Sequence, residues 1–340
     1  MATTGKAPDE GAAERPDRGG VQVPPEAGLP AGPPAVRFGV LTRAAHVVGL
    51  SGLHMNLYAA AAQSEGWLEA RLFERPAALV EAMEQGQLDL ALLPLRDALQ
   101  IYLKLGEQAP RVVAGAALGD EMYLLRKDVL EFDFNNLRPV RVTVLETPAL
   151  DIRRALKLDS GAAPSVSLRK PDDLRQALAS REVDLALAPE PLASIVAALS
   201  GSRVVRPGET EGGELLGGAV LVASAAFLRE HEPLLNRLVM AHVVSATTVA
   251  NDLDTAARRA IEFIGKAGLE APALMFWRQG LPRLHFQSEL PVEELAALLE
   301  VARNQGLPGS ERELEGLLAP AILESVLREL EEGDTEQDEK

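Results

Sequence analysis

Two segments of the chain share one order of hydrophobic and polar positions. Residues 79–99 (LVEAMEQGQLDLALLPLRDAL) and residues 174–194 (LRQALASREVDLALAPEPLAS) each begin with apolar residues at helical spacing and continue as an apolar run without polar alternation. This pattern is typical of a short surface helix that leads into a strand buried on both faces, as in a parallel sheet. An Asp begins and a Pro ends each apolar run. We therefore predict that the chain contains two related halves.

Each half also contains two earlier strand patterns. Residues 36–42 (VRFGVLT) begin the first half and residues 140–147 (VRVTVLET) begin the second. Each is followed by a helical segment and then by a shorter strand pattern, at 69–74 and 165–170 respectively. Each half is thus predicted to fold as β-α-β-α-β, which right-handed crossover connections wind into a small, mostly parallel sheet.

The remaining segments connect and complete the two halves. Residues 111–129 contain two strand-like runs around Gly119 and Asp120, and residues 217–228 show a strand pattern that leads into a helix and returns the chain to the first half. From there onward the spacing is helical. The predicted organisation is a disordered Pro- and Gly-rich leader (1–35), lobe I (36–128 and 217–328), lobe II (129–216) and a solvated acidic tail (329–340).

Composition and charge exclude several classes of function. The formal net charge of −16 at pH 7 argues against nucleic acid as a partner, because binding to phosphates requires a basic surface. The absence of cysteine excludes disulfides, thiolate nucleophiles and cysteine-ligated zinc, and the five histidines show no metal-binding spacing. No segment is apolar enough to span a bilayer, and no signal peptide is visible. We therefore expect no metal, no cofactor and no integral membrane segment.

The predicted topology places the candidate site between the lobes. Open α/β sheets bind ligands beyond the carboxyl ends of their strands, so two facing lobes would place such ends around one cleft. The segments that follow these strands supply the candidate ligand-binding residues Thr42, Arg43, His46, His54, Leu95, Arg96, Asp97, Thr147, Asp151 and Glu190.

Several of these candidates have more than one interpretation. The polar residues after the first strand form a hydrogen-bonding and potentially cationic cluster. The Gly-rich run at 46–54 (HVVGLSGLH) is either an anion-binding loop ahead of a helix or a plain surface loop. Arg96 and Asp97 either pair with each other or reach the ligand, and Asp151 is most simply an N-cap. Glu190 stands between two prolines, which favours a rigid carboxylate aimed into the cleft.

Three segments resemble a known family. They are residues 59–94 (AAAAQSEGWLEARLFERPAALVEAMEQGQLDLALLP), 183–196 (VDLALAPEPLASIV) and 219–252 (AVLVASAAFLREHEPLLNRLVMAHVVSATTVAND). Their order and spacing resemble the solute-binding proteins of the sulfonate, taurine and nitrate group, which also includes proteins for thiamine-pyrimidine precursors, over about residues 36–325. The resemblance implies an α/β, two-lobed type II periplasmic-binding-protein fold. In that fold each lobe is a small mixed, mostly parallel sheet flanked by helices, and the lobes are hinged around a cleft.

The resemblance also implies a function. It predicts non-catalytic binding of a small anionic or oxyanionic solute, as the substrate-binding component of an ABC-type importer whose permease is the partner. One alternative is a cytoplasmic ligand sensor of the same fold that controls a regulatory partner protein. Another is an enzyme on this fold, although the lack of cysteine argues against the relatives that use cysteine chemistry. As written, the sequence indicates a cytoplasmic protein, and a signal at the true N-terminus would instead place it in the periplasm or at the cell surface.

Overall fold

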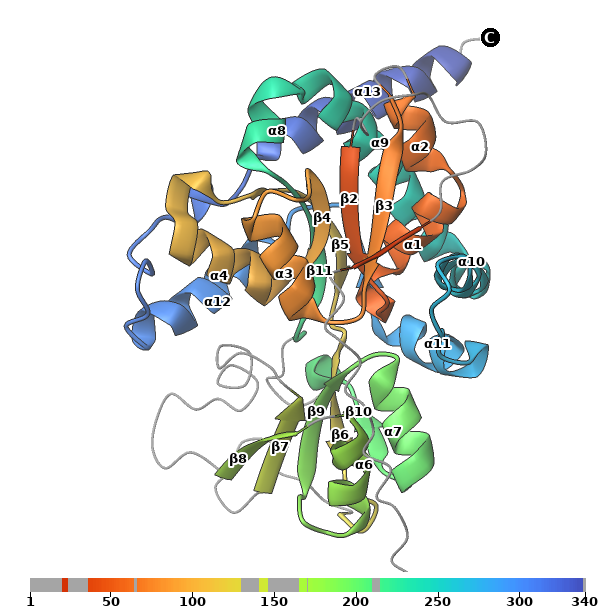
Figure 1. The fold of residues 1–340 in the computed structure, drawn as a ribbon, viewed down its shortest axis with the longest axis vertical. Coiled ribbons are helices and arrows are strands. Elements are labelled where there is room, and N and C mark those ends of the chain that lie inside the picture. The colour runs from red at the N-terminus through yellow and green to blue at the C-terminus, as the bar shows by residue number, and fades with distance from the viewer. Residues whose placement is uncertain are drawn as a thin grey trace, which may run out of the picture.

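The chain folds into two lobes, each built on its own β-sheet (Figure 1). The computed structural model describes residues 20–23, 36–63, 66–129, 141–145, 165–169, 171–209 and 215–338. Within these residues one sheet has seven strands and the other has five. The predicted Thr147 and Asp151 lie outside the described residues.

Lobe I contains the larger sheet, in the order β1-β3-β2-β4-β11-β5-β12. Strand β2 lies parallel to β3 and β4, whereas β11 is antiparallel to both β4 and β5, as a strand returning from the other lobe must be. All side chains of β4 and β11 are buried, because helices cover both faces of the sheet. The strands are β1 (Val21–Gln22), β2 (Val36–Leu41), β3 (Leu68–Phe73), β4 (Leu90–Pro94), β5 (Arg111–Leu118), β11 (Gly218–Ala223) and β12 (His285–Phe286).

Lobe II contains the smaller sheet, in the order β10-β6-β9-β7-β8. Strand β7 is parallel to β8 and β9, and β6 is antiparallel to β9 and β10. The predicted strand patterns are confirmed in both lobes, with shifts of a residue or two at their ends. The strands are β6 (Glu121–Leu125), β7 (Arg141–Leu145), β8 (Ser165–Arg169), β9 (Leu185–Pro189) and β10 (Arg203–Val205).

Helices cover both sheets and complete lobe I. In lobe I, α1 packs on α9 and α10, and α13 packs on α9, while α12 lies against α4 (Figure 1). The α-helices are α1 (Val47–His54), α2 (Leu57–Ala62), α3 (Pro76–Glu84), α4 (Leu95–Leu105), α6 (Pro171–Ala179), α7 (Leu192–Ser200), α8 (Ala225–Glu230), α9 (Glu232–Asn251), α10 (Leu253–Lys266), α11 (Leu274–Gly280), α12 (Val292–Asn304) and α13 (Pro320–Asp338). The short 3₁₀ helices are η1 (Ala44–His46), η2 (Gly106–Gln108), η3 (Pro207–Glu209), η4 (Leu281–Arg283) and η5 (Leu314–Gly316).

The aspartate that begins each repeated apolar run makes the same ion pair in both lobes. Asp89 accepts hydrogen bonds from the backbone N–H of Arg37 (2.8 Å) and from its guanidinium Nε (2.9 Å) and Nη2 (2.6 Å). Asp184 accepts the equivalent three bonds from Arg141, at 3.1, 3.1 and 3.0 Å. In each lobe the aspartate N–H also donates to the arginine carbonyl, at 2.9 Å. Each pair therefore ties the start of the third strand to the start of the first, at the edge of the sheet opposite the predicted cleft.

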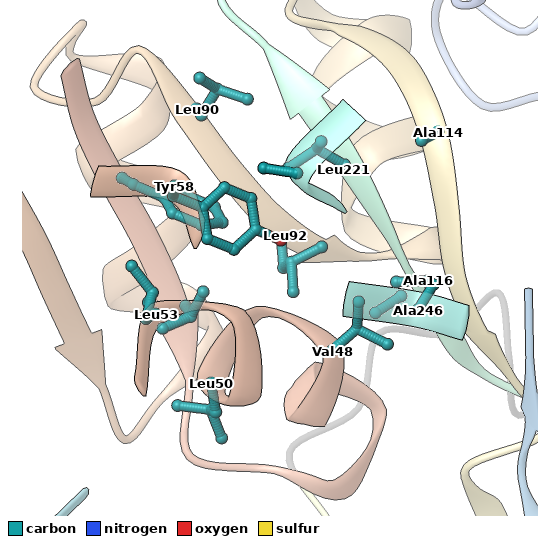
Figure 2. Close-up of a cluster of buried hydrophobic side chains, with 14 of the residues drawn as sticks. Val48, Leu50, Leu53, Tyr58, Leu90, Leu92, Ala114, Ala116, Leu221 and Ala246 are labelled. Atoms are coloured by element: carbon teal, nitrogen blue, oxygen red, sulfur yellow. The ribbon is translucent and has the colours of Figure 1, made fainter. Parts of the chain in front are cut away.

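The Gly-rich run at 46–54 forms a buried helix, so its interpretation as a loop is wrong. Residues Val47–His54 are α1, and most of their side chains are buried (Figure 2). A Cβ on Gly49 would lie 2.6 Å from the Leu92 side chain, and one on Gly52 would lie 2.5 Å from that of Tyr58. The glycines therefore let α1 lie close against the sheet and its neighbouring helices.

The chain crosses between the lobes earlier than predicted. Strand β6 belongs to the sheet of lobe II, so the first crossing is at Gly119 and Asp120 rather than near residue 128. The returning crossing lies at Leu216 and Gly217, as expected. The two crossings run side by side, because Gly119 N–H donates to the Gly217 carbonyl (3.2 Å) and Glu121 N–H to the Leu216 carbonyl (3.1 Å).

Two terminal segments are more ordered than predicted. Residues 21–22, expected in a disordered leader, form β1 and pair antiparallel with β3. Helix α13 continues to Asp338, where an irregular acidic tail was expected from residue 329. Both segments lack the apolar periodicity that identified the other elements. Contacts with neighbouring elements stabilise both segments instead. Strand β1 pairs with the edge of β3, and α13 begins on the apolar surface of α9.

The duplicated ion pairs give a prediction on stability. Asp89→Asn keeps the shape of the side chain but removes the charge that three donors share, so we expect the free energy of unfolding to fall by about 1–3 kcal/mol. Asp184→Asn should cost more, since Asp184 pairs with Arg126 (2.7 Å) as well as with the half-exposed Arg141, so two guanidinium groups lose their partner. Urea denaturation of both variants measures the difference, and an equal or reversed order would contradict the expectation.

Candidate functional site

A small pocket lies where the two lobes meet. The pocket is shallow and partly open: the space free of atoms is about 200 Å³ when the open solvent at its mouth is included. The polar side chains come from lobe I and from the first crossing, whereas two glycines of the second crossing form the remaining wall. The lining residues are Arg43, Pro94, Leu95, Arg96, Asp120, Glu121, Gly217 and Gly218.

The topology of lobe I determines which side chains reach this pocket. Arg43 follows the carboxyl end of β2 and precedes η1 in extended backbone conformation. Arg96 is the second residue of α4, directly after β4. Because β2 and β4 are parallel neighbours, the residues beyond their carboxyl ends meet at the same edge of the sheet. The structure therefore brings Arg43, Leu95 and Arg96 together, as the sequence predicted.

The glycines of the second crossing leave no space for a side chain. A Cβ on Gly217 would lie 2.3 Å from Asp120 Oδ1, and one on Gly218 would lie 2.4 Å from the Ala117 carbonyl oxygen. Both residues also have a positive φ, of 71° and 136°, which disfavours other residue types. Close backbone approach at this point therefore positions Asp120 and Glu121 against lobe I.

Arg96 is buried and paired with acidic side chains. Its Nη1 lies 3.1 Å from Glu121 Oε1, and its Nε lies 3.7 Å from Asp97 Oδ1. The pairing with Asp97 is one of the two interpretations that the sequence left open. Glu121 belongs to β6 of lobe II, so the ion pair with Arg96 also joins the two lobes.

Arg43 differs from Arg96 in its partners. Within the described part of the chain, its guanidinium makes no hydrogen bond to a carboxylate or a carbonyl. Burial lowers the pKa of Arg43, and the positive charge of Arg96 lowers it further, while Glu121 and Asp120 oppose this shift. Arginine keeps its proton in proteins, so the guanidinium remains charged at neutral pH. Arg43 thus presents donors to the pocket that no group of the described residues uses.

His46 and Thr42 support Arg43 without adding charge. The buried His46 accepts a hydrogen bond at Nδ1 from Leu41 N–H (3.2 Å), which places its proton on Nε2. Burial, with a contribution from Arg43, lowers the pKa of His46 to about 3, so the ring is neutral at physiological pH. Thr42 N–H donates to the Phe73 carbonyl (3.1 Å) and fixes the chain at the end of β2.

Glu190 is brought to the lobe boundary, but its carboxylate does not line the pocket. The side chain is fully buried and accepts hydrogen bonds from Ser194 N–H (3.1 Å), Ser194 Oγ (3.1 Å) and Arg283 Nη1. His54 lies elsewhere: it ends α1 and pairs with Glu262 of α10 through a 2.9 Å contact. The helical path of residues 47–54 carries His54 away from the cleft.

Sequence reasoning missed several residues of this region. Asp120, Glu121 and the glycines of the second crossing were noticed only as connections between strands. The pair Gly119-Asp120 between two apolar runs, and the adjacent Gly217-Gly218, were usable signals for a close crossing. Arg283 lies in a segment without a recognisable motif, so nothing in the sequence pointed to it.

Metal binding and membrane crossing are two further properties that the described residues can be searched for. No group of three or more His, Cys, Asp or Glu side chains among them is arranged to bind a metal ion. No helix in the described part of the chain is long and apolar enough to cross a membrane.

Comparisons with known proteins support the fold. No protein-family model and no curated protein sequence matches the chain. Solved structures do match it. The periplasmic aliphatic sulphonate binding protein SsuA from Escherichia coli superposes with a TM-score of 0.67 at 14% identity, over 85% of this chain and 92% of that one. The periplasmic nitrate-binding protein NrtA from Synechocystis PCC 6803 gives a TM-score of 0.65 at 10% identity, over 87% and 89%.

One similar structure is an enzyme. The desulfurization enzyme DSZB superposes with a TM-score of 0.56 at 16% identity, over 86% of this chain and 99% of that one. The predicted two-lobed type II periplasmic-binding-protein fold is therefore confirmed, and several of the similar structures are named as proteins that bind a sulfonate or nitrate.

The buried histidines give a prediction on pH. His242 donates from Nε2 to the Gly115 carbonyl (2.6 Å) and accepts at Nδ1 from Tyr58 (2.8 Å), and burial lowers its pKa to about 4. Below about pH 6.5 both histidines are protonated in the unfolded chain, whereas His46 and His242 stay neutral in the folded protein. The free energy of unfolding should therefore fall between pH 7 and pH 5, by up to about 1.4 kcal/mol per pH unit for each histidine.

Denaturant titrations at several pH values measure this slope. The variant His242→Gln, which keeps a donor and an acceptor, should show a smaller slope than the parent protein. Leu298→Ala, which alters a buried apolar side chain and no titratable group, provides the control and should leave the slope unchanged. Equal slopes in the parent and in His242→Gln would show that His242 does not contribute.

Proposed function

We propose that the chain binds a small anion in the pocket between its lobes, and that Arg43 is the main ligand of the anion. The observation that carries this proposal is the guanidinium of Arg43, which lines the pocket and makes no hydrogen bond within the described residues. Arg43 is partly buried, and a partly buried guanidinium gains from acceptors; an oxyanion matches its planar donors. Arg96 cannot fill this role as readily because Glu121 and Asp97 already offset its charge.

The carboxylates around the pocket narrow the class of anion. Asp120 and Glu121 lie close enough to Arg43 to favour its charged form. Their oxygens can accept several hydrogen bonds but donate none when ionised. An anion that carries its own hydrogen-bond donor, such as bicarbonate or a small amino-sulfonate, would therefore suit the pocket better than nitrate or sulfate.

The size of the pocket favours a compact ligand. The pocket is small and partly open to solvent, so a molecule of a few non-hydrogen atoms suits it better than a larger one. A pyrimidine precursor would require the lobes to separate, and the walls offer no aromatic face for it. We therefore place small oxyanions and short organic anions ahead of heteroaromatic ligands.

The finer role that we propose is that of substrate-binding component of an ABC-type importer, acting without catalysis and with a permease as partner. The similar structures support this role, since one is named as the ligand binding component of an ABC-type import system and another as the sulfonate-binding protein of a sulfonate ABC transporter. SsuA from Escherichia coli and NrtA are named as periplasmic proteins, so the cytoplasmic location expected from the sequence has no support there. Uptake of the radiolabelled anion by the native host, with and without this protein, tests the importer role.

Replacement of Arg43 tests the binding site directly. Ligands are first found by thermal shift among bicarbonate, nitrate, sulfate, taurine and short alkanesulfonates, since a ligand at 100 times its Kd adds roughly 2.7 kcal/mol of stability. Arg43→Gln should then weaken binding of the ligand found by roughly tenfold to a hundredfold in calorimetry, because charge-assisted hydrogen bonds are lost.

A matched arginine gives the control. Arg229→Gln changes an exposed arginine of α8, at the end of β11 opposite Gly218, and should leave affinity unchanged. Unchanged affinity in Arg43→Gln, or an equal loss in both variants, would refute the assignment of the anion to Arg43.

A further inference from the structure

One residue of lobe II makes a dense set of contacts with lobe I. Glu190 stands between β9 and α7, and none of its surface is exposed to solvent. Its Oε1 accepts hydrogen bonds from Arg283 Nη1, which belongs to η4 of lobe I, and from Ser194 Oγ (3.1 Å). Its Oε2 accepts from Ser194 N–H (3.1 Å), and Arg283 Nη1 also donates to Ser194 Oγ (2.8 Å). Glu190, Ser194 and Arg283 thus form one buried network across the lobe boundary.

The backbone of Glu190 joins the lobes a second time. Its carbonyl accepts a hydrogen bond from Ala44 N–H (3.2 Å), in η1 of lobe I directly after Arg43. Its N–H donates to the Asp120 carbonyl (2.9 Å) at the first crossing. The fold would otherwise leave the Ala44 N–H, at the start of a helical turn, available to a ligand. Here the Ala44 N–H donates instead to the Glu190 carbonyl of the opposite lobe.

Close helix packing surrounds this network. Helix α7 of lobe II lies against α11 of lobe I, on the same side of the molecule (Figure 1). Gly280, the last residue of α11, lies close against this network, because a Cβ there would lie 3.0 Å from Glu190 Oε2 and 3.1 Å from Glu190 Cβ, tighter than most such contacts. The boundary is therefore packed as tightly as a protein interior, with a carboxylate and a guanidinium at its centre.

We propose that Glu190 and Arg283 form a latch that holds the lobes closed before any ligand arrives. Rotation of lobe II about the two crossings must separate Glu190 from Arg283 and from Ala44, because each contact joins different lobes. A carboxylate that loses its guanidinium partner while still partly enclosed pays a large desolvation cost. The two residues are positioning residues: they keep Arg43 and Arg96 opposite Asp120 and Glu121 and touch no ligand themselves.

The latch deepens the proposed function, since it regulates the same pocket. A protein that is closed in the free state admits and releases a ligand only while the lobes are open. The rate at which the latch opens therefore limits both association and dissociation. Weakening the latch should therefore raise both rate constants. Replacement of Arg43 acts differently, because it removes ligand contacts and leaves the closed state in place.

The absence of cysteine makes closure directly measurable. Ala77→Cys on α3 and Ala179→Cys on α6 are exposed positions in opposite lobes, and two fluorophores attached there report the distance between lobes in single molecules. We expect one high-transfer population for the ligand-free protein. Glu190→Gln and Arg283→Gln should each raise the ratio of open to closed molecules by roughly tenfold or more, as expected for loss of a charge-assisted hydrogen bond. Arg283→Lys, which restores the charge, should recover part of the closed population.

The matched control is an ion pair inside one lobe. Asp184→Asn removes a comparable aspartate–arginine pair within lobe II and should leave the distance distribution unchanged, even where it lowers the melting temperature. Arg283 is 30% exposed, so Arg283→Gln should fold and carries the test if Glu190→Gln does not. An open population already dominant in the parent protein, no shift in Arg283→Gln, or an equal shift in Asp184→Asn would overturn the latch. All of these measurements are made without ligand. A result against the latch therefore does not test anion binding at Arg43, and a result against anion binding does not test the latch.

Discussion

The pairing of the two chain crossings determines how everything at the lobe boundary is arranged. Because Gly119 N–H donates to the Gly217 carbonyl and Glu121 N–H to that of Leu216, the crossings behave as a short two-stranded ribbon between the sheets. The ribbon places Glu121 against Arg96 of lobe I and presents the Asp120 carbonyl to Glu190 N–H. Its tightness depends on glycine, since a Cβ at position 217 would overlap Asp120. The pocket and the latch are both built against this ribbon.

The internal duplication explains why so much of the fold could be predicted from the sequence. A strand buried on both faces leaves a long apolar run, and the aspartate before it has to find a partner, which in both lobes is the arginine at the start of the first strand. The apolar periodicity therefore identified the strands and their order. It could not identify α1, because Gly49 and Gly52 lower helix propensity and only tertiary packing against Leu92 and Tyr58 justifies them.

The candidate site was predictable only in part, because several of its residues interact with partners that are far away in the sequence. Arg43 and Arg96 follow parallel strands, so the topology alone places them together. Their partners come from elsewhere: Glu121 lies 25 residues from Arg96, and Arg283 lies 93 residues from Glu190. The orientation of Glu190 shows the limit most clearly. The flanking prolines predicted a rigid carboxylate, but which lobe it would face depended on Arg283, at the end of η4, which no motif marks.

The hydrogen bond from Glu190 N–H to the Asp120 carbonyl has a mechanical consequence. It places the latch beside the pivot, whereas β8, at the outer edge of the lobe II sheet, is far from it (Figure 1). In a rigid rotation, displacement grows with distance from the axis, so a separation of one bond length at Glu190 becomes a much larger excursion at β8. A force applied at the outer edge of the lobe II sheet therefore exerts a larger torque about the crossings than the same force applied at Glu190. A partner that binds the outer end of lobe II would therefore open the pocket with much less force than one that acts beside the pivot.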